Sequence, residues 1–173
     1  IERPTKILQP IPSEANFESS VSYEDVSAEV GLRLSPLSEP QVLPKMLTRE
    51  KYNNDWIWEN VLPQLGSGIS FRDLDGDNNP ELLFVRDGAP ILFKNTGGHF
   101  KPVKVSGLPT SGRFLGVIVG DVDNDADGDV YLTGVGSNEL YLNDGTGQFT
   151  IFANETIRGE DISVSAAFAD IDH

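Results

Sequence analysis

The sequence predicts an all-β fold built from repeated four-stranded antiparallel units. An acidic loop begins at Asp73, Asp121 and Asp170, so the loop recurs after 48 and then 49 residues. Short strand-like segments separated by turn residues flank the first two loops, and the 17 glycines and 11 prolines indicate a turn-rich chain. A fixed period of this size with four short strands per unit is typical of β-propeller blades. We therefore predict a partial β-propeller of about two and a fraction blades.

The first repeat is predicted over residues 65–110. Its second strand is a nearly continuous apolar run, a pattern typical of a strand that is covered on both faces. Its last strand contains Pro102, which lacks an N–H donor and therefore favours the edge of the sheet. The predicted strands are Gly68–Arg72, Glu81–Arg86, Ile91–Asn95 and His99–Val105.

The second repeat, residues 111–160, follows the same pattern. Asn143 lies 48 residues after Asn95, whereas Phe149 lies 49 residues after Phe100, so the added residue belongs to the turn at 144–147. This consistent register indicates a true repeat. The predicted strands are Leu115–Gly120, Val130–Thr133, Glu139–Asn143 and Gln148–Phe152.

The parts outside the repeats are less regular. We predict an extended arm at 1–22, an irregular segment at 23–64 with a strand-like stretch at 23–32, and the start of a truncated third repeat at 161–173. Two complete units do not close a ring of 4–8 blades. The chain is therefore expected to be the N-terminal part of a longer polypeptide, with the remaining blades unresolved, cleaved or supplied by another chain.

The charge of the chain is concentrated in its loops. The formal net charge is −14, and the three loops hold four, five and two acidic residues, eleven of the 27 in the chain. No basic patch is available to neutralise phosphates, so nucleic acid is not expected as a partner. The absence of cysteine excludes disulfides and thiol chemistry, and no apolar run reaches the ~20 residues that a membrane-spanning helix needs.

The acidic loops are predicted to bind a cation. Ionised carboxylates at alternate positions repel one another unless a cation neutralises them. A solvated acidic turn is the alternative, since Asp and Asn are ordinary turn residues. The repetition of the loop in register favours the cation, and a cluster of oxygen ligands without Cys or His favours calcium.

At these loops the sequence resembles the FG-GAP/VCBS repeat proteins, whose blades carry calcium loops like those of integrin α-subunit propellers. Residues 116–130 and 138–149 are most similar to the branch that includes the UnbV-type proteins and cartilage acidic protein, and 23–32 is similar to the linker that follows a blade there. The resemblance implies structural calcium ligands at Asp73, Asp75, Asp77, the carbonyl of Asn79 and Glu81; at Asp121, Asp123, Asp125, the carbonyl of Asp127 and Asp129; and at Asp170 and Asp172 in a partial third site.

The chain departs from the family at the sixth loop position. The family has Gly there, where the loop turns sharply, but this chain has Asn78 and Ala126. Asn tolerates a left-handed backbone, whereas Ala adopts it at a cost of about 1–2 kcal/mol. The second loop is therefore expected to bend differently, or to bind more weakly, than its five acids suggest.

The leading functional expectation is a non-enzymatic protein- or glycan-binding or assembly module. Calcium loops of this kind fill where free calcium is high, which favours an extracellular, periplasmic or cell-surface protein. The alternative is the propeller domain of a secreted polysaccharide-active enzyme, a lyase or hydrolase whose catalytic residues lie outside this chain. Trp56 and Trp58 are candidates for a partner surface, or for side chains that plug the edge or the central opening of the propeller.

Overall fold

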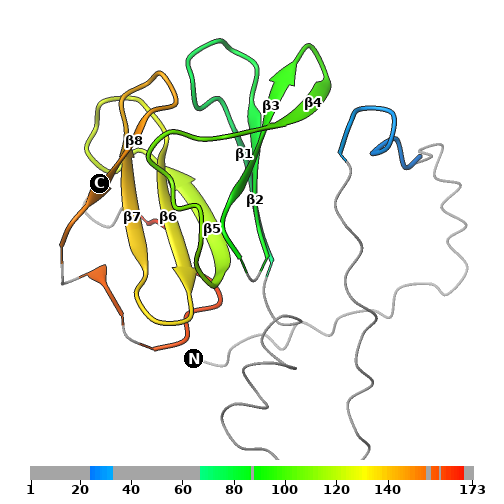
Figure 1. Cartoon of the computed structure of the whole chain (residues 1–173). Helices are drawn as coiled ribbons and strands as arrows, with labels where there is room; N and C mark the ends of the chain where they lie inside the picture. Colours follow the sequence, from blue (N-terminus) through cyan, green and yellow to red (C-terminus); the bar gives the residue numbers. More distant parts are fainter. Residues whose placement is uncertain (1–23, 33–66, 87, 155–156, 160, 170–173) are drawn as a thin grey trace, which may run out of the picture.

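The structure, a computed structural model, describes residues 24–32, 67–86, 88–154, 157–159 and 161–169 (Figure 1). It contains two four-stranded antiparallel sheets, each with its strands in sequence order. This arrangement confirms the all-β fold and the partial propeller. The first sheet, blade 1, contains β1 (Gly68–Arg72), β2 (Glu81–Val85), β3 (Ile91–Thr96) and β4 (His99–Val103); the second, blade 2, contains β5 (Phe114–Gly120), β6 (Asp129–Gly134), β7 (Glu139–Asn143) and β8 (Phe149–Phe152).

All eight predicted strands are present, and their ends shift by at most two residues. The edge position of Pro102 is confirmed, because β3 is the one described strand that pairs with β4, and Pro102 lies opposite Phe93. The expectation that β2 is covered on both faces holds for one face. Leu83 and Val85 are buried, whereas Leu82 and Phe84 on the other face are only half-buried.

The two blades pack face to face through one apolar core. β5 lies against β1 and β2, and the strands of blade 2 occupy the left half of the sheet pair in Figure 1. A Cβ atom on Gly68 would lie 2.3 Å from the backbone nitrogen of Val117, so the close approach of β1 to β5 requires glycine. The buried core comprises Leu74, Leu83, Val85, Leu92, Leu108, Phe114, Val117, Val130, Leu132, Tyr141 and Phe149.

The outer face of blade 1 has no such cover from the described residues. Ile69 and Phe71 of β1 are 64% and 58% exposed. Val117, which lies 48 residues after Ile69 and occupies the same place in blade 2, is 7% exposed because blade 1 covers it. Equivalent positions of the repeat are therefore buried in one blade and open in the other.

The strand expected within residues 23–32 is not formed, and the described residues 24–32 make a helical turn instead. Val26 C=O accepts from Glu29 N and Val30 N, at 2.9 and 3.0 Å. Asp25 stabilises the start of the turn by accepting from Ser27 N at 3.0 Å, and Gly31 ends it in a left-handed conformation with φ of 88°. This local hydrogen bonding outweighs the β-pattern of the segment.

The turn is attached to the outer strand of blade 1. Phe100 N donates to Val30 C=O at 2.6 Å, and in blade 2 the equivalent Phe149 N donates to Ser106 C=O at 2.9 Å. The glycines that follow these two carbonyls, Gly31 and Gly107, both have positive φ. The turn at 24–32 therefore contacts blade 1 as the linker between the blades contacts blade 2.

Residues 161–169 lie beside blade 2 as an extended segment. Ile162 forms an antiparallel bridge with Val135, and Ser163 N donates to Gly134 C=O at 2.8 Å. The segment repeats the contact of β5 with blade 1, where Phe114 bridges to Gly88. The arm at 1–22, residues 33–64 with Trp56 and Trp58, and the third-loop residues Asp170 and Asp172 lie outside the described residues.

Candidate metal centre

Each acidic loop joins the first two strands of its blade. Loop 1 (73–81) joins β1 to β2, and loop 2 (121–129) joins β5 to β6. The first Asp of each loop organises it by accepting backbone N–H groups. Asp73 accepts from Gly76 N and Asn78 N, both at 2.8 Å, and Asp121 accepts from Asn124 N at 2.7 Å and Ala126 N at 3.0 Å. These bonds fold the chain around the first carboxylate.

The ninth residue of each loop is a buried acid at the start of the second strand. Glu81 and Asp129 are 1% and 0% exposed, and they accept from Leu74 N at 3.0 Å and Val122 N at 2.8 Å. The second oxygen of Asp129 accepts from Asn143 N at 2.9 Å. Both acids therefore close their loops back onto the second loop residue.

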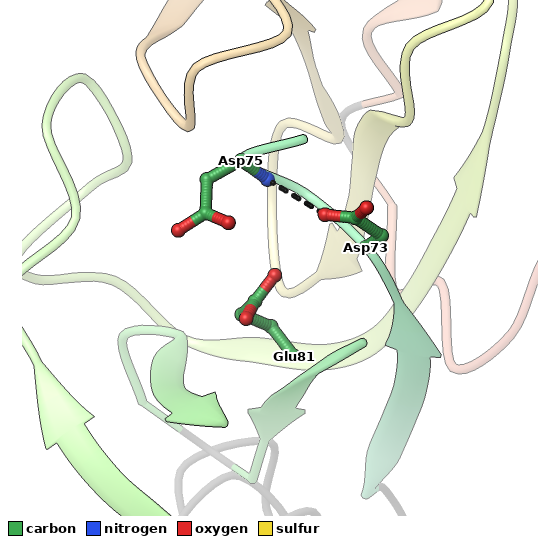
Figure 2. Close-up of side chains that lie close together, drawn as sticks. All are labelled: Asp73, Asp75 and Glu81. Atoms are coloured by element: carbon green, nitrogen blue, oxygen red, sulfur yellow. Dashed lines mark hydrogen bonds between the residues drawn. The ribbon is translucent and has the colours of Figure 1, made fainter. Parts of the chain in front are cut away.

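The folded loops bring carboxylates from the first, third and ninth positions together. One oxygen from each of Asp73, Asp75 and Glu81 lies within 4.8 Å of the others, and Figure 2 shows the three side chains around a common space. Asp121, Asp123 and Asp129 form the equivalent group in loop 2. The predicted ligands outside these two groups, from the fifth and seventh loop positions, are Asp77, Asn79, Asp125 and Asp127.

Two positions in each loop have a left-handed backbone. The sixth residues Asn78 and Ala126 have φ of 66° and 77°, the conformation that the family's glycine implies, so the expectation that loop 2 bends differently is wrong. The fourth residues Gly76 and Asn124 have φ of 75° and 63°, and the sequence pattern does not predict this second left-handed position. Gly128 serves a different purpose. A Cβ atom there would lie 2.9 Å from Cγ1 of Val119 and 3.0 Å from Nε of Arg72, so glycine permits close packing between the blades.

Replacing Ala126 by Gly is expected to stabilise the protein by about 0.5–1 kcal/mol. The substitution removes the 1–2 kcal/mol cost of a left-handed alanine, and the added freedom of the unfolded chain offsets about 0.4–1 kcal/mol of that gain. Urea denaturation in calcium-free buffer measures the change. Ala153→Gly is the control, because Ala153 is exposed and does not have positive φ. A gain for the control that equals that of Ala126→Gly would contradict the strain at position 126.

The acids of loop 1 are paired with a cationic side chain from a neighbouring strand. Lys94, on β3, places its Nζ 2.7 Å from Oδ2 of Asp77 and 3.4 Å from Oε1 of Glu81, and it also pairs with Oδ2 of Asp75. Desolvation opposes the charge of Lys94, but the hydrogen bonds to Asp75 and Asp77 outweigh it and raise the lysine pKa. The hydrogen bond from Lys94 lowers the pKa of Asp77.

The oxygen atoms of loop 1 are not all satisfied by the protein. Oδ1 of Asp75 and Oε1 of Glu81 are buried and have no hydrogen-bond partner. The 3.4 Å separation of the latter from Lys94 Nζ is an ion pair without hydrogen-bond geometry. Oxygen atoms left without donors and facing other carboxylates suit a hard cation such as calcium, so the residues present fit the group that the resemblance implies.

Loop 2 has no cation of its own among the described residues. Leu142 takes the place that Lys94 has in blade 1, and no described Lys or Arg forms an ion pair with this loop. Desolvation raises the pKa of Asp123, and repulsion from Asp125 and Asp129 raises it further. The pKa of Asp127 is raised by desolvation and then by its acidic neighbours. Uncompensated negative charge therefore accumulates in loop 2.

Loop 1 also lies at the interface between the blades. Asn143 donates its side-chain amide to Leu74 C=O at 2.9 Å and to Gly128 C=O at 3.3 Å, and so links the two loops. A Cβ atom on Gly147 would lie 3.3 Å from Cβ of Asp75. The conformation of loop 1 is thus coupled to the β7–β8 turn of blade 2.

Comparison with known proteins identifies the repeat. The family model of the FG-GAP-like repeat matches residues 73–132 and 121–173, which together make up more than half of the chain. The matched segments begin at Asp73 and Asp121, the first residues of loops 1 and 2. No curated protein and no solved structure matches the chain. The chain belongs to the FG-GAP-like repeat family.

Proposed function

We propose that this chain is part of a calcium-stabilised β-propeller that acts outside the cytoplasm as a protein- or glycan-binding or assembly module. The observation that carries the proposal is the pair of equivalent carboxylate groups, Asp73, Asp75 and Glu81 in one blade and Asp121, Asp123 and Asp129 in the next. Calcium would neutralise these carboxylates and so hold together the two strands that an occupied loop joins. Its role is structural, because the loops connect strands that form the core.

The open face of blade 1 supports an assembly role. Ile69 and Phe71 are exposed although their equivalents in blade 2 lie toward the core, so a further blade of the same kind fits this face. The open space around the turn at Gly97–Gly98 also favours a further blade on this side of blade 1. Nothing lies within 4 Å of a Cβ atom at either glycine, whereas the equivalent Gly147 lies against loop 1 of the preceding blade. The remaining blades come from the rest of the polypeptide or from another chain.

The proposed location follows from the expected affinity of the loops. Extracellular calcium modules bind with dissociation constants of about 10⁻⁴–10⁻³ M, which suits short loops of this kind in calcium-rich surroundings. No helix with the length and apolar character of a membrane span is found among the residues that the structure describes.

Calcium titration of the 173-residue chain tests the proposal. Millimolar calcium is expected to raise Tm by about 3–10 °C relative to EDTA, because a ligand that binds only the folded state stabilises it by mass action. Magnesium at the same concentration is the comparison ion, since it requires a tighter octahedral site. Differential scanning calorimetry gives Tm, and an identical Tm in calcium and EDTA would contradict the proposal.

Two variants locate the effect in loop 2. Asp123→Asn removes a carboxylate from the group of three and is expected to abolish the share of the calcium response that arises there. Asp144→Asn removes a charge near the loop but leaves the predicted ligands in place. Its acceptor oxygen is kept, so the bonds from Thr146 N at 2.9 Å and Gln148 N at 3.3 Å remain. The control is therefore expected to keep the full calcium response.

A further inference from the structure

We infer that the two loops use different cations: the ammonium group of Lys94 serves loop 1 from within the chain, and loop 2 depends on calcium from solution. The inference rests on the proposed function, because it assigns the calcium requirement to one of the two loops. It predicts that loops of nearly equal acidity differ in calcium affinity because of one residue on the neighbouring strand.

The position of Lys94 carries the first part of the inference. The side chain projects from β3, and its Nζ lies among three acids of loop 1, at 2.7 Å from Asp77 and 3.4 Å from Glu81 and in contact with Asp75. Asp75 and Glu81 belong to the group of three carboxylates that would hold a metal. The ammonium group therefore lies beside the same carboxylates, Asp75 and Glu81, that would bind calcium.

The surroundings hold the ammonium in place. The Lys94 side chain is 24% exposed, and Glu81 is 1% exposed, so water screens the ion pairs only in part. Lys101 lies directly opposite Lys94 in the β3–β4 ladder, and like charges in that relation repel. The repulsion from Lys101 and the attraction of the acids both direct Lys94 toward loop 1.

Blade 2 provides the contrast within the same chain. The residue equivalent to Lys94 is Leu142, and loop 2 carries five acids where loop 1 carries four. Arg72 lies against Gly128 but forms no ion pair with the loop acids within 4.0 Å. Counting ionised side chains and Lys94, the formal charge is −3 in loop 1 and −5 in loop 2. Among the residues that the structure describes, loop 2 has no counter-charge like that of Lys94.

Calcium binding in loop 1 therefore has an added cost. Calcium takes 6–8 oxygen ligands at 2.3–2.6 Å, and the carboxylates of Asp75 and Glu81 do not serve both that ion and Lys94 without repulsion between the two cations. Coupling between close, partly buried charges is large enough to change affinity by at least about tenfold. Loop 1 is thus expected to bind calcium at least about tenfold more weakly than it would with Leu at position 94.

Separate substitutions at positions 94 and 142 test the inference. Isothermal titration calorimetry of the full chain compares the calcium affinity of Asp123→Asn, in which loop 2 is disabled, with that of Asp123→Asn/Lys94→Leu. The added substitution is expected to strengthen binding by at least about tenfold. Leu142→Lys in the otherwise native chain is expected to weaken binding at loop 2 by a similar factor. The Lys94→Leu chain is also expected to have a lower Tm than the native chain in EDTA and to regain it in calcium.

Lys104→Leu is the matched control. It removes the same charge from the residue that follows β4, where the side chain is exposed and forms no ion pair with a described acid of either loop, and it is expected to leave calcium affinity nearly unchanged. Equal affinities for the Asp123→Asn chain with and without Lys94→Leu, together with calcium binding by the native chain, would overturn the inference and leave the proposed function standing. No calcium binding by any variant would overturn both. Far-UV circular dichroism establishes that each variant is folded.

Discussion

Asp129→Asn is expected to lower the free energy of unfolding by about 2–4 kcal/mol, since hydrogen bonds to charged groups contribute about 1.5–3 kcal/mol each. Asp129 is 0% exposed, and its two oxygens accept from Val122 N at 2.8 Å and Asn143 N at 2.9 Å. An asparagine presents an NH₂ group to one of these donors, so one buried N–H loses its acceptor. Urea denaturation in EDTA measures this loss without a contribution from bound metal.

Asp125→Asn is the matched control for that variant. It makes the same chemical change in the same loop, but Asp125 is exposed and its Oδ1 accepts from Asp127 N at 3.0 Å, a bond that asparagine preserves. The expected change is within about 0.5 kcal/mol, as for most surface substitutions. Equal losses for the two variants would show that burial and the double hydrogen bond of Asp129 do not stabilise the blade.

The two loops also differ in the hydrogen bonds that their ninth residue accepts: both carboxylate oxygens of Asp129 accept one. Its longer counterpart, Glu81, accepts from Leu74 N with one oxygen and leaves the other without a hydrogen bond beside Lys94. The residue at the ninth position therefore has one structural bond in both loops and a second one only in loop 2. The ninth residue of loop 2 is held by two backbone donors, whereas the second oxygen of Glu81 in loop 1 lies beside the ammonium group of Lys94.

The strands and their registers are predictable from the sequence because the repeat makes each position visible twice. The apolar alternation of β1 and β5 is ambiguous by itself, but Ile69 and Val117 align through the 48-residue period and define the same face. The left-handed sixth position is predictable from the family resemblance, because the family has glycine there. The fourth position is not, because Gly76 and Asn124 are both ordinary turn residues.

Other features depend on interactions that the local pattern does not contain. The segment 24–32 has the alternating pattern of a strand, but Asp25 and Gly31 favour a turn that then bonds to Phe100, 70 residues from Val30. The role of Lys94 is also non-local, since β3 lies 17 and 19 residues from the loop acids that it contacts. The alignment of the two repeats does indicate this role, because blade 1 has the charged Lys94 where blade 2 has the apolar Leu142.

Gly107→Ala is expected to destabilise the protein by about 2–5 kcal/mol, the sum of left-handed strain and an overpacked contact. Gly107 has φ of 87°, and a Cβ atom there would lie 1.6 Å from the carbonyl oxygen of Phe149. Because that neighbour is backbone, either the linker or β8 must move. The movement would break the 2.9 Å bond from Phe149 N to Ser106 C=O. Thermal and urea unfolding of the full chain measure the effect.

Gly97→Ala separates the contact from the strain. Gly97 has φ of 64°, but nothing lies within 4 Å of a Cβ atom there, so only the strain of about 1–2 kcal/mol is expected. Both substitutions restrict the unfolded chain equally, and the difference between them reports how strongly the linker holds blade 2. Since blades are stabilised through their neighbours, a large difference would mean that Gly107 couples the unfolding of the two blades. Equal losses would mean that the close contact at Gly107 does not add to the stability of blade 2.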